Sequence, residues 1–501
     1  MILIIMLFIF KMSAQNGGFQ KGLFNQNGIT STCIDIIEVS TNYYIAVGIS
    51  VDTVNNQSFK RLVFKGVDNL GNELWSKRYG NKTTNYTYFD ESKRHLIKSG
   101  NFLYFFSAVT DSTLKIYSTV IKLNFIGDTI WKKNYKDISN DFIIFGGVKT
   151  SNNHFLFTGG IRSASTSSVL ILKTDTNGNT IFTKKIAPLN TNVDSHYGKA
   201  IAVDSSKKIV IAGEKIINGI QYQLLICTDS TGFVIGQSGF SGSFGGTFYD
   251  LIKSQDNNFI AVGLNNQGNN LGGPFGTERW KGQIVKFKIN PSIAYIWGKE
   301  VDTLSVYNVC ETVNELPNGD IIVNGVLDTL LNYNINEHVR YRIIRLNPNG
   351  GVIYKRYVTP KLAQIKNFML KSSNLTLNGG LIIAADYVYD SGNKPFFIVK
   401  LDSNGCDSSV NYCQTVGINE QAINNQLKIY PNPTNDVLNI EISYPSIPET
   451  SKIQITDLLG RTVLESKLCT QINVKDLTSG IYLLQLYDKE KLIAIEKIMI
   501  E

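Results

Sequence analysis

Side chains that could carry out catalysis are few and widely spaced in this chain of 501 residues. A nucleophilic triad needs a base beside a Ser or Cys motif such as GxSxG, and no His lies near one. The four His are His95, His154, His196 and His338. We interpret His95 and His154 as structural, because they fall in an apolar strand pattern and in a tight turn.

Carboxylates that could serve a glycosidase lie in or beside long polar segments. A glycosidase needs two Asp or Glu that face each other across a pocket. Glu278, Asp302 and Glu337 have the required type, but no spacing in the sequence brings them together. We therefore predict no catalytic residue. A hydrolase or lyase acting on extracellular polysaccharide stays open as the alternative function.

No pattern predicts a metal ion or a cofactor. The recurring Asp-x-x-Gly turns hold at most one carboxylate beyond the Asp, too few for the six to eight oxygens that calcium prefers. The six Cys include no CxxC pair, and the His residues lack metal-ligand spacing. We predict neither a structural zinc nor a calcium site.

Two long polar segments contain the best candidates for ligand contacts. NNQGNNLGGPFGTERWK covers residues 265–281 and LDTLLNYNINEHVR covers residues 327–340. Long loops on a rigid scaffold are where binding residues concentrate, and aromatic and basic groups suit sugar or peptide surfaces. The candidates are Arg279, Trp280, Tyr333 and His338. The alternative, that all four are solvated loop residues, stays open.

The scaffold that would position these loops is predicted from a hairpin that recurs seven times. In each copy an apolar segment, a short polar turn and a second apolar strand precede a small residue. The small residues are Gly48, Ser107, Gly159, Gly213, Gly263, Gly325 and Ala385. We expect neighbouring sheets to crowd each other at these positions.

A second hairpin follows in each copy, usually around an Asp- or Asn-x-x-Gly turn. Its glycines are Gly71, Gly127, Gly178, Gly232, Gly350 and Gly405. The fifth copy, KFKINPSIAYIW, has no Gly and about two extra residues, which predicts a wider turn. Past the turn an aromatic opens the fourth strand, at Trp75, Trp131, Phe182, Trp297 and Tyr354, with Ile235 in the fourth copy. A basic residue usually lies two positions later, and we expect the aromatics to fill the outer gap between sheets.

Four strands in each of seven copies predict an all-β seven-bladed β-propeller over residues 17–405. A four-stranded sheet with two apolar faces cannot bury itself alone, and radial stacking of four to eight sheets solves this. The seventh copy ends at Gly405 without a fourth strand, whereas Phe19-Gln20-Lys21 has the aromatic-x-basic pattern of one. We expect this N-terminal segment to close the ring. The architecture resembles secreted seven-bladed β-propellers, which says little about activity.

The N-terminal residues indicate export. Residues 2–10 are an unbroken apolar run, followed by Lys11 and the small residues Ser13 and Ala14, which predicts a signal peptide over residues 1–14. No later stretch approaches the roughly 20 apolar residues of a transmembrane helix. The net charge of +8 comes from 49 basic and 41 acidic residues and is not gathered into a block, so charge gives no support to nucleic-acid binding.

The cysteines fall into two groups. Cys33, Cys227 and Cys310 lie in apolar strand patterns and are predicted to be small buried residues. Cys406 and Cys413 are seven residues apart in the polar stretch CDSSVNYC. We predict that these two form a disulfide, which export permits.

The C-terminal residues predict a second, smaller domain. After a linker at residues 406–426, residues 427–501 alternate short strands with Gly and Asn turns, which predicts a small immunoglobulin-like β-sandwich. Several motifs there resemble, in order and spacing, the type A C-terminal sorting domain of the type IX secretion system. The matching residues are Pro431, Asn432, Pro433, Leu438, Gly460, Gly480, Tyr482 and Lys497.

This resemblance implies a Bacteroidota protein that transits the periplasm and crosses the outer membrane. Its implied partners are the type IX translocon and a sortase-like enzyme that removes the domain as the protein is attached to the cell surface or released. Our preferred hypothesis for the function is a secreted or cell-surface propeller that binds a glycan or a protein, for adhesion or capture, without catalysis of its own.

Overall fold

The computed structural model of the protein describes residues 18–23, 31–54, 57–81, 84–87, 92–164, 166–187, 195–239, 245–266, 280–301, 307–328, 339–358, 365–389, 395–406, 427–442, 451–457, 461–488 and 491–501. The regular structure in these residues is β-strand, which confirms the all-β prediction. The chain divides into two compact units, Met1–Thr415 and Val416–Glu501. The boundary between them falls within the predicted linker.

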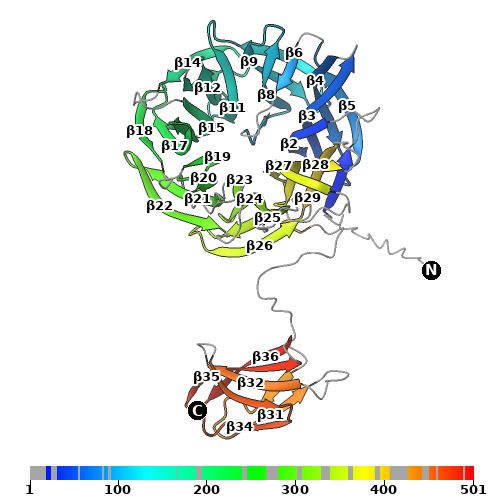
Figure 1. The fold of residues 1–501 in the computed structure, drawn as a ribbon, viewed down its shortest axis with the longest axis vertical. Coiled ribbons are helices and arrows are strands. Elements are labelled where there is room, and N and C mark those ends of the chain that lie inside the picture. The colour runs from blue at the N-terminus through cyan, green and yellow to red at the C-terminus, as the bar shows by residue number, and fades with distance from the viewer. Residues whose placement is uncertain are drawn as a thin grey trace, which may run out of the picture. The chain divides into compact units, whose positions relative to one another are not determined.

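The N-terminal unit consists of antiparallel sheets arranged in a ring (Figure 1). One sheet contains β2 (Ser31–Ser40), β3 (Tyr43–Val54), β4 (Gln57–Val67) and β5 (Glu73–Tyr79). The next contains β6 (Thr84–Thr87), β7 (Leu96–Ser99), β8 (Phe102–Asp111), β9 (Ile116–Asn124) and β10 (Thr129–Tyr135). In this sheet β6 and β7 both pair with β8, so the first strand of the hairpin is interrupted.

Two larger sheets each combine two four-stranded antiparallel sets. The first comprises β11 (Asp141–Lys149), β12 (Phe155–Arg162), β13 (Ser167–Thr174), β14 (Thr180–Ile186), β15 (Ser195–Val203), β16 (Ile209–Ile217), β17 (Ile220–Thr228) and β18 (Val234–Ser238). The second comprises β19 (Gly246–Lys253), β20 (Phe259–Asn266), β21 (Trp280–Ile289), β22 (Ile293–Val301), β23 (Tyr307–Glu315), β24 (Ile321–Asp328), β25 (Val339–Leu346) and β26 (Val352–Val358). A single parallel pair joins the two sets in each case, between Ser167 and Ser195 and between Trp280 and Tyr307.

The last sheet of this unit includes the N-terminal strand. It has the order β1 (Phe19–Leu23), β29 (Phe396–Leu401), β28 (Leu381–Tyr389) and β27 (Ile365–Leu375). The antiparallel register places Phe19 opposite Lys400 and Leu23 opposite Phe396. Phe19 and Leu23 are buried in one apolar cluster with Val63 of β4. The predicted pairing of the first segment with the last sheet is therefore observed.

Apolar side chains fill the interfaces between neighbouring sheets. Phe64 of β4 and Phe105 of β8 pack edge to face, with ring centroids 5.4 Å apart, inside one buried cluster. Another cluster combines Ile343 of β25 with Ile383 of β28. The predicted buried cysteines, Cys33, Cys227 and Cys310, are fully buried in such clusters or beside them. Each sheet therefore relies on its neighbours to cover its apolar faces.

The recurring small residue, which lies inside the second strand, has a different cause from the one predicted. We expected crowding between neighbouring sheets, but a Cβ atom on Gly159 would overlap the carbonyl oxygen of Ile143 in its own sheet. A Cβ atom on Gly48 would likewise overlap the carbonyl oxygen of Thr32, and it would also lie too close to the ring of Phe396 in the neighbouring sheet. Opposite these residues the first strand has a β-bulge, which pushes its backbone toward the second strand.

The same bulge recurs in the first strand of other sets. Its extra residues are Ile34, Phe145, Lys199, Tyr249, Glu311 and Lys371. Each precedes the small residue of its own copy by 14 positions, for example Lys199 before Gly213. First strands such as β15 and β19 lie nearest the centre of the ring in Figure 1, so the bulges belong to the strands closest to the central axis.

The outer strands contact the next sheet through the aromatics that the sequence singled out. A Cβ atom on Gly127 would lie 2.6 Å from the indole of Trp75, and one on Gly178 would lie 2.7 Å from the indole of Trp131. Both glycines belong to the turn of the following set. The same relation holds for Phe182 and Lys184 on Gly232, Trp297 on Gly350, Tyr354 on Gly405, and Phe19 and Lys21 on Gly71. We call these contacts the outer clasps.

The fifth copy corrects one prediction. Its turn is tighter than the others, not wider: Ile289 pairs with Ile293 and only three residues lie between them. In the first copy, Val67 pairs with Glu73 across five residues. The two extra residues therefore lengthen β21 and β22 instead of the turn. The set before it corrects another prediction: the register pairs Gly236, not Ile235, with Cys227 at the position where Trp75 pairs with Gly66. The missing glycine and the missing large ring therefore belong to the same clasp.

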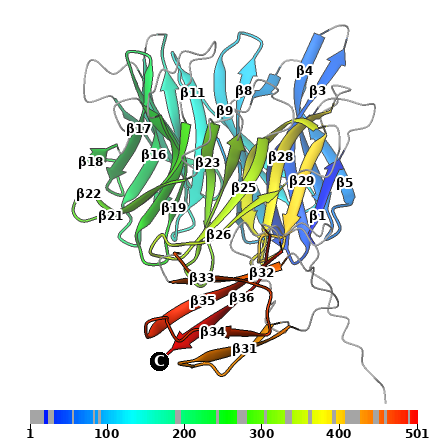
Figure 2. The ribbon, with the colours of Figure 1, turned by 60° about the horizontal axis from the view of Figure 1, so that its bottom comes forward.

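The C-terminal unit consists of two sheets that share a core. One contains β30 (Leu427–Tyr430), β31 (Val437–Ile442) and β34 (Gln471–Asn473). The other contains β33 (Thr462–Lys467), β32 (Ser451–Asp457), β35 (Gly480–Asp488) and β36 (Lys491–Ile500). Leu438 and Ile440 of the first sheet pack in one cluster with Ile455 and Leu484 of the second. Figure 2 shows β35 and β36 side by side.

Candidate functional site

Most of the predicted ligand-contact residues lie outside the described residues. This holds for Arg279, Tyr333 and His338 and for the carboxylates Glu278, Asp302 and Glu337. Trp280 is described: it is the first residue of β21, is half-buried and lies beside Tyr307 of β23. Its role in binding therefore remains a prediction.

The described histidines do not form a catalytic group. His95 is buried, its Nδ1 lies 3.0 Å from the carbonyl oxygen of Phe106, and burial lowers its pKa. Burial, with a smaller effect of Lys215, lowers the pKa of His196 to about 4. His154 lies in the tight turn before β12, where its backbone N–H donates to Thr150 Oγ1 over 3.2 Å.

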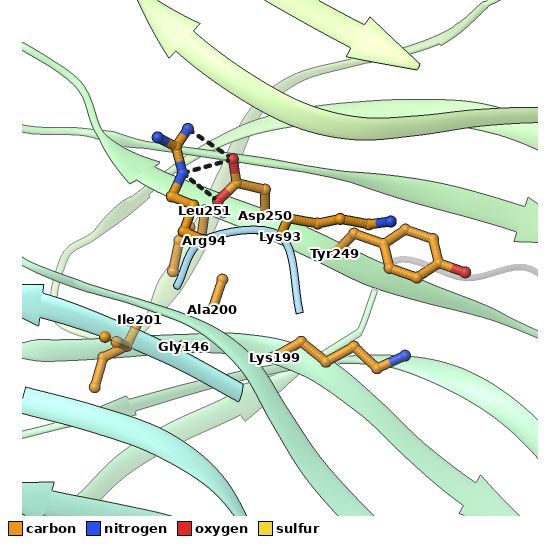
Figure 3. A pocket seen from close by; sticks show the side chains of 10 residues that line it. Lys93, Arg94, Gly146, Lys199, Ala200, Ile201, Tyr249, Asp250 and Leu251 are labelled. Atoms are coloured by element: carbon orange, nitrogen blue, oxygen red, sulfur yellow. Dashed lines mark hydrogen bonds and ion pairs between the residues drawn. The ribbon is translucent and has the colours of Figure 1, made fainter. Parts of the chain in front are cut away.

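A pocket near the central axis brings together charged and aromatic side chains from several sheets. Lys199 and Tyr249 are bulge residues of β15 and β19, and Lys93 and Arg94 precede β7. Gly146 and Ala200 line the same pocket, and a Cβ atom on Gly146 would lie 2.5 Å from the carbonyl oxygen of Lys199. Figure 3 shows Lys93, Tyr249 and Lys199 extending in one direction and the Arg94–Asp250 pair in another.

Two buried lysines flank the ring of Tyr249. The Nζ atoms of Lys93 and Lys199 lie 5.2 and 4.9 Å from its ring centroid, a distance at which cation–π attraction operates. Lys93 also pairs with Glu311 across 2.9 Å, and Lys199 pairs with Glu214 across 2.7 Å. The lysine side chains are only 5% and 2% exposed, so each buried charge is compensated by a carboxylate.

Arg94 links three sheets across the axis. Its Nη2 donates to Asp250 Oδ2 over 2.8 Å and to the carbonyl oxygen of Val313 over 2.6 Å, and its Nη1 donates to Asn374 Oδ1 over 3.0 Å. Asp250 also accepts the backbone N–H of Val313. Because Arg94 comes from the β6–β10 sheet and its partners lie on β19, β23 and β27, it fixes the floor of the pocket.

A signal for this pocket was present in the sequence and was missed. Lys199 and Tyr249 interrupt first strands that are otherwise mainly apolar, and the offset of 14 residues places them at one level. In the second copy the residue 14 positions before Ser107 is Lys93. The pairing of Lys93 with Glu311, 218 residues away, could not be read from any local pattern.

Two of the sorting-motif residues, Asn432 and Lys497, meet in the C-terminal unit. Asn432, between Pro431 and Pro433, donates through Nδ2 to the carbonyl oxygen of Lys497 over 2.8 Å and accepts the N–H of Met499. The remaining described residues of the motif are structural parts of the sandwich. Leu438 is in its core, Gly480 begins β35, and Tyr482 donates its hydroxyl to the carbonyl oxygen of Thr478. Gly460 lies outside the described residues.

Only one of the two cysteines predicted to form a disulfide lies in the part of the chain that the structure describes. Cys406 is disulfide-bonded. Its predicted partner, Cys413, lies outside the described residues, so the pairing remains a prediction. Mass spectrometry of non-reduced peptides should find the two linked, and finding both thiols free would contradict it.

Comparison with known protein families identifies the C-terminal unit. Residues 428–501 match the model of the secretion system C-terminal sorting domain, as the sequence predicted. This is the sorting domain of type IX secretion, and such a tail implies export, followed by secretion or attachment at the cell surface. No helix among the described residues has both the length and the apolar character needed to span a bilayer.

Solved structures resemble the chain only weakly, and no curated protein matches it. Sqt1 from Chaetomium thermophilum has 10% identity and a TM-score of 0.42, over 75% of this chain and 86% of that one. A Trypanosoma rangeli sialidase in complex with sialic acid has 10% identity and a TM-score of 0.41, over 77% of this chain and 59% of that one. The WD40 domain of SCAP from fission yeast has 9% identity and a TM-score of 0.33, over 75% and 98%. Similarities this weak assign no activity.

Proposed function

We propose that the protein is a secreted or cell-surface binding protein that captures or adheres to a glycan or a protein ligand. Its N-terminal unit is a seven-bladed β-propeller closed by β1, and its C-terminal unit is an immunoglobulin-like sandwich that directs the chain to the type IX translocon and a sortase-like enzyme. The carrying observation is the axial pocket, where long polar side chains converge but every described charge already has a partner.

The blade count is supported by the outer clasps. Each clasp joins one four-stranded set to the next, and Phe19 and Lys21 complete the series by packing on Gly71 of the first set. Treating the single parallel pairs as contacts between neighbouring blades gives seven sets around one axis. Closure by pairing the first strand with the last sheet also removes an exposed sheet edge.

Binding is favoured over catalysis by the state of the carboxylates. A retaining or inverting glycosidase needs two carboxyl groups free to act on the scissile bond. The pocket carboxylate Asp250 is held by Arg94 and backbone amides, and Glu214 and Glu311 pair with the pocket lysines. The alternative, a propeller hydrolase or lyase acting on extracellular polysaccharide, would have to draw its carboxylates from the loop residues that lie outside the described ranges.

One experiment separates the two functions. The purified mature protein is screened on a glycan array and against extracellular proteins, and each hit is then incubated with the protein and its products are analysed. The proposal expects binding with the ligand recovered intact. Release of shortened or unsaturated sugars would contradict it and establish the alternative.

The export route has its own test. A chain that ends at Asn425 lacks the sorting domain and should stay in the periplasm, whereas the full chain should reach the medium or the cell surface. The variant Asn432→Ala removes the link between the Pro-Asn-Pro turn and β36 and serves as a finer probe. Surface delivery of the truncated chain would contradict the proposed route.

A further inference from the structure

Strand β36 lies at one edge of its sheet in the C-terminal unit, where the strand order is β33-β32-β35-β36. An edge strand presents N–H and C=O groups that can pair with a strand of another molecule. The composition of β36 favours such pairing. Residues 492–500, LIAIEKIMI, contain seven apolar residues, one Glu and one Lys, and neither Pro nor Gly. With no net charge, this segment is suited to pairing with a second copy of itself.

The Pro-Asn-Pro turn and the residue after it cover the end of this edge with four hydrogen bonds. Asn432 donates through Nδ2 to the carbonyl oxygen of Lys497 over 2.8 Å, and its Oδ1 accepts the N–H of Met499 over 2.9 Å. Thr434 donates its backbone N–H to the carbonyl oxygen of Met499 over 3.0 Å and accepts the N–H of Glu501 over 3.0 Å. Both partners on the turn therefore bond to the backbone of the last residues of the chain.

The bonded backbone groups belong to alternate residues, at positions 497, 499 and 501. Alternate residues of a strand direct their N–H and C=O groups to the same side, so these groups form the outer edge of β36. Thr434 also forms a parallel bridge with Ile500. We call residues 432–434 the edge cover, because they occupy the place of a short fifth strand. Pro433 has no N–H, so the outer side of the cover lacks a donor that a further strand would need.

The opposite edge of the same sheet is protected in another way. Strand β33 has six residues, and its exposed side chains include Glu465 and Lys467. Short edge strands with charged side chains resist pairing with other molecules. Strand β36 has ten residues and lacks this protection along its apolar length. The two edges therefore meet the same hazard by different means.

We propose that the edge cover prevents β36 from pairing with β36 of a second copy of the chain. Two copies that pair through this edge would be related by a two-fold axis, with the same strand on both sides of the interface. This role goes beyond the proposed export route. It gives the Pro-Asn-Pro turn a task in the folded chain that is independent of the translocon.

The first test uses the full mature chain with Asn432→Ala. Asn432 is exposed, and the substitution removes both of its side-chain hydrogen bonds to the edge. At low protein concentration, amide hydrogen exchange in the peptide that contains residues 497–501 should become at least about tenfold faster, because fewer bonds hold the edge closed. Sedimentation velocity should show self-association at a concentration at least about tenfold lower than the natural chain requires. Exchange in the same peptide should slow again as the variant associates.

Asn435→Ala is the matched control. Asn435 is an exposed residue of the same turn, and within the described part of the chain it makes no hydrogen bond to β36. Its substitution should leave exchange and self-association within about twofold of the natural chain. Thr434→Pro is a second way to open the edge, because it removes the backbone N–H that donates to Met499. It should reproduce both effects of Asn432→Ala.

Three results would overturn the proposal. Unchanged exchange at residues 497–501 in Asn432→Ala would show that the turn does not cover the edge. Faster exchange without tighter self-association would exclude a second copy as the molecule that is kept away. Equal effects of Asn432→Ala and Asn435→Ala would show that the hydrogen bonds to β36 are not the cause. The export route is judged separately, by the chain that ends at Asn425, so either proposal can fail without the other.

Discussion

The outer rim and the inner axis of the N-terminal unit differ in how closely their residues repeat from one set to the next. At the rim, the same aromatic-on-glycine clasp recurs, as in Trp75 on Gly127 and Trp131 on Gly178. At the axis, the residue type at the bulge position varies among the sets and includes Lys199, Tyr249 and Glu311. Repetition at the rim holds the sheets together, and variation at the axis leaves each set free to contribute its own chemistry.

Removal of β1 should have the largest effect. Deleting residues 15–27 leaves β29 as an exposed edge and removes Phe19 and Leu23 from a buried cluster. Their burial alone is worth about 3 to 6 kcal/mol, and the lost strand pairing adds to it. Urea unfolding of the mature chain should show a sharply lower midpoint for the N-terminal unit. An unchanged midpoint would mean that closure contributes nothing.

The second largest loss of stability is expected when the ion pair between Arg94 and Asp250 is broken. Asp250→Ala leaves the largely buried guanidinium of Arg94 without its carboxylate, which should lower the free energy of unfolding by about 3 to 5 kcal/mol. Asp128→Ala is the control, because Asp128 pairs with Lys77 at an exposed site and should cost less than about 1 kcal/mol. If both variants lost the same free energy of unfolding, ion pairs at the axis would contribute no more to stability than ion pairs at the rim.

A single outer clasp should matter less. Trp131→Ala removes a half-buried indole from Gly178 and from the edge-to-face contact with Tyr104, at a cost of about 2 kcal/mol. The neighbouring Ile130→Ala should change stability by less than about 0.5 kcal/mol, because Ile130 is 51% exposed. Thermal unfolding of both variants tests this, and a larger loss for Ile130→Ala would contradict the clasp.

The smallest expected effect is a pH dependence from His196. Burial lowers its folded-state pKa to about 4, below the ordinary 6.5. The unfolded chain therefore binds more protons between these values, and stability falls as the pH drops from about 6.5 toward 4. His196→Phe should flatten this part of the curve relative to the natural chain. Parallel curves for the two proteins would show that His196 does not titrate on unfolding.

The sequence was sufficient for the scaffold and insufficient for the pocket. Strand alternation, polar turns and the aromatic series are local signals, so the sets and the pairing of β1 could be predicted. The contacts of Lys93 with Glu311 and of Arg94 with Asn374 join residues 218 and 280 positions apart, and only the ring geometry brings them together. The cause of the small residue at Gly159 was also missed, because a bulge in the opposing strand has no clear sequence signature.

The clasp between the fourth and fifth copies has a consequence for modularity. There, Gly236 occupies the strand position that holds the aromatic in the other sets, and a Cβ atom on it would lie 3.9 Å from Ser292 of a three-residue turn that lacks glycine. The aromatic side chain and the glycine that receives it are therefore both absent from this clasp. The fit between the outer strand of one copy and the turn of the next therefore depends on both copies together. In a recombinant in which the fifth copy followed the second, Trp131 would face a turn that has no glycine to accommodate its indole. Copies of this protein can therefore be exchanged only together with their neighbour.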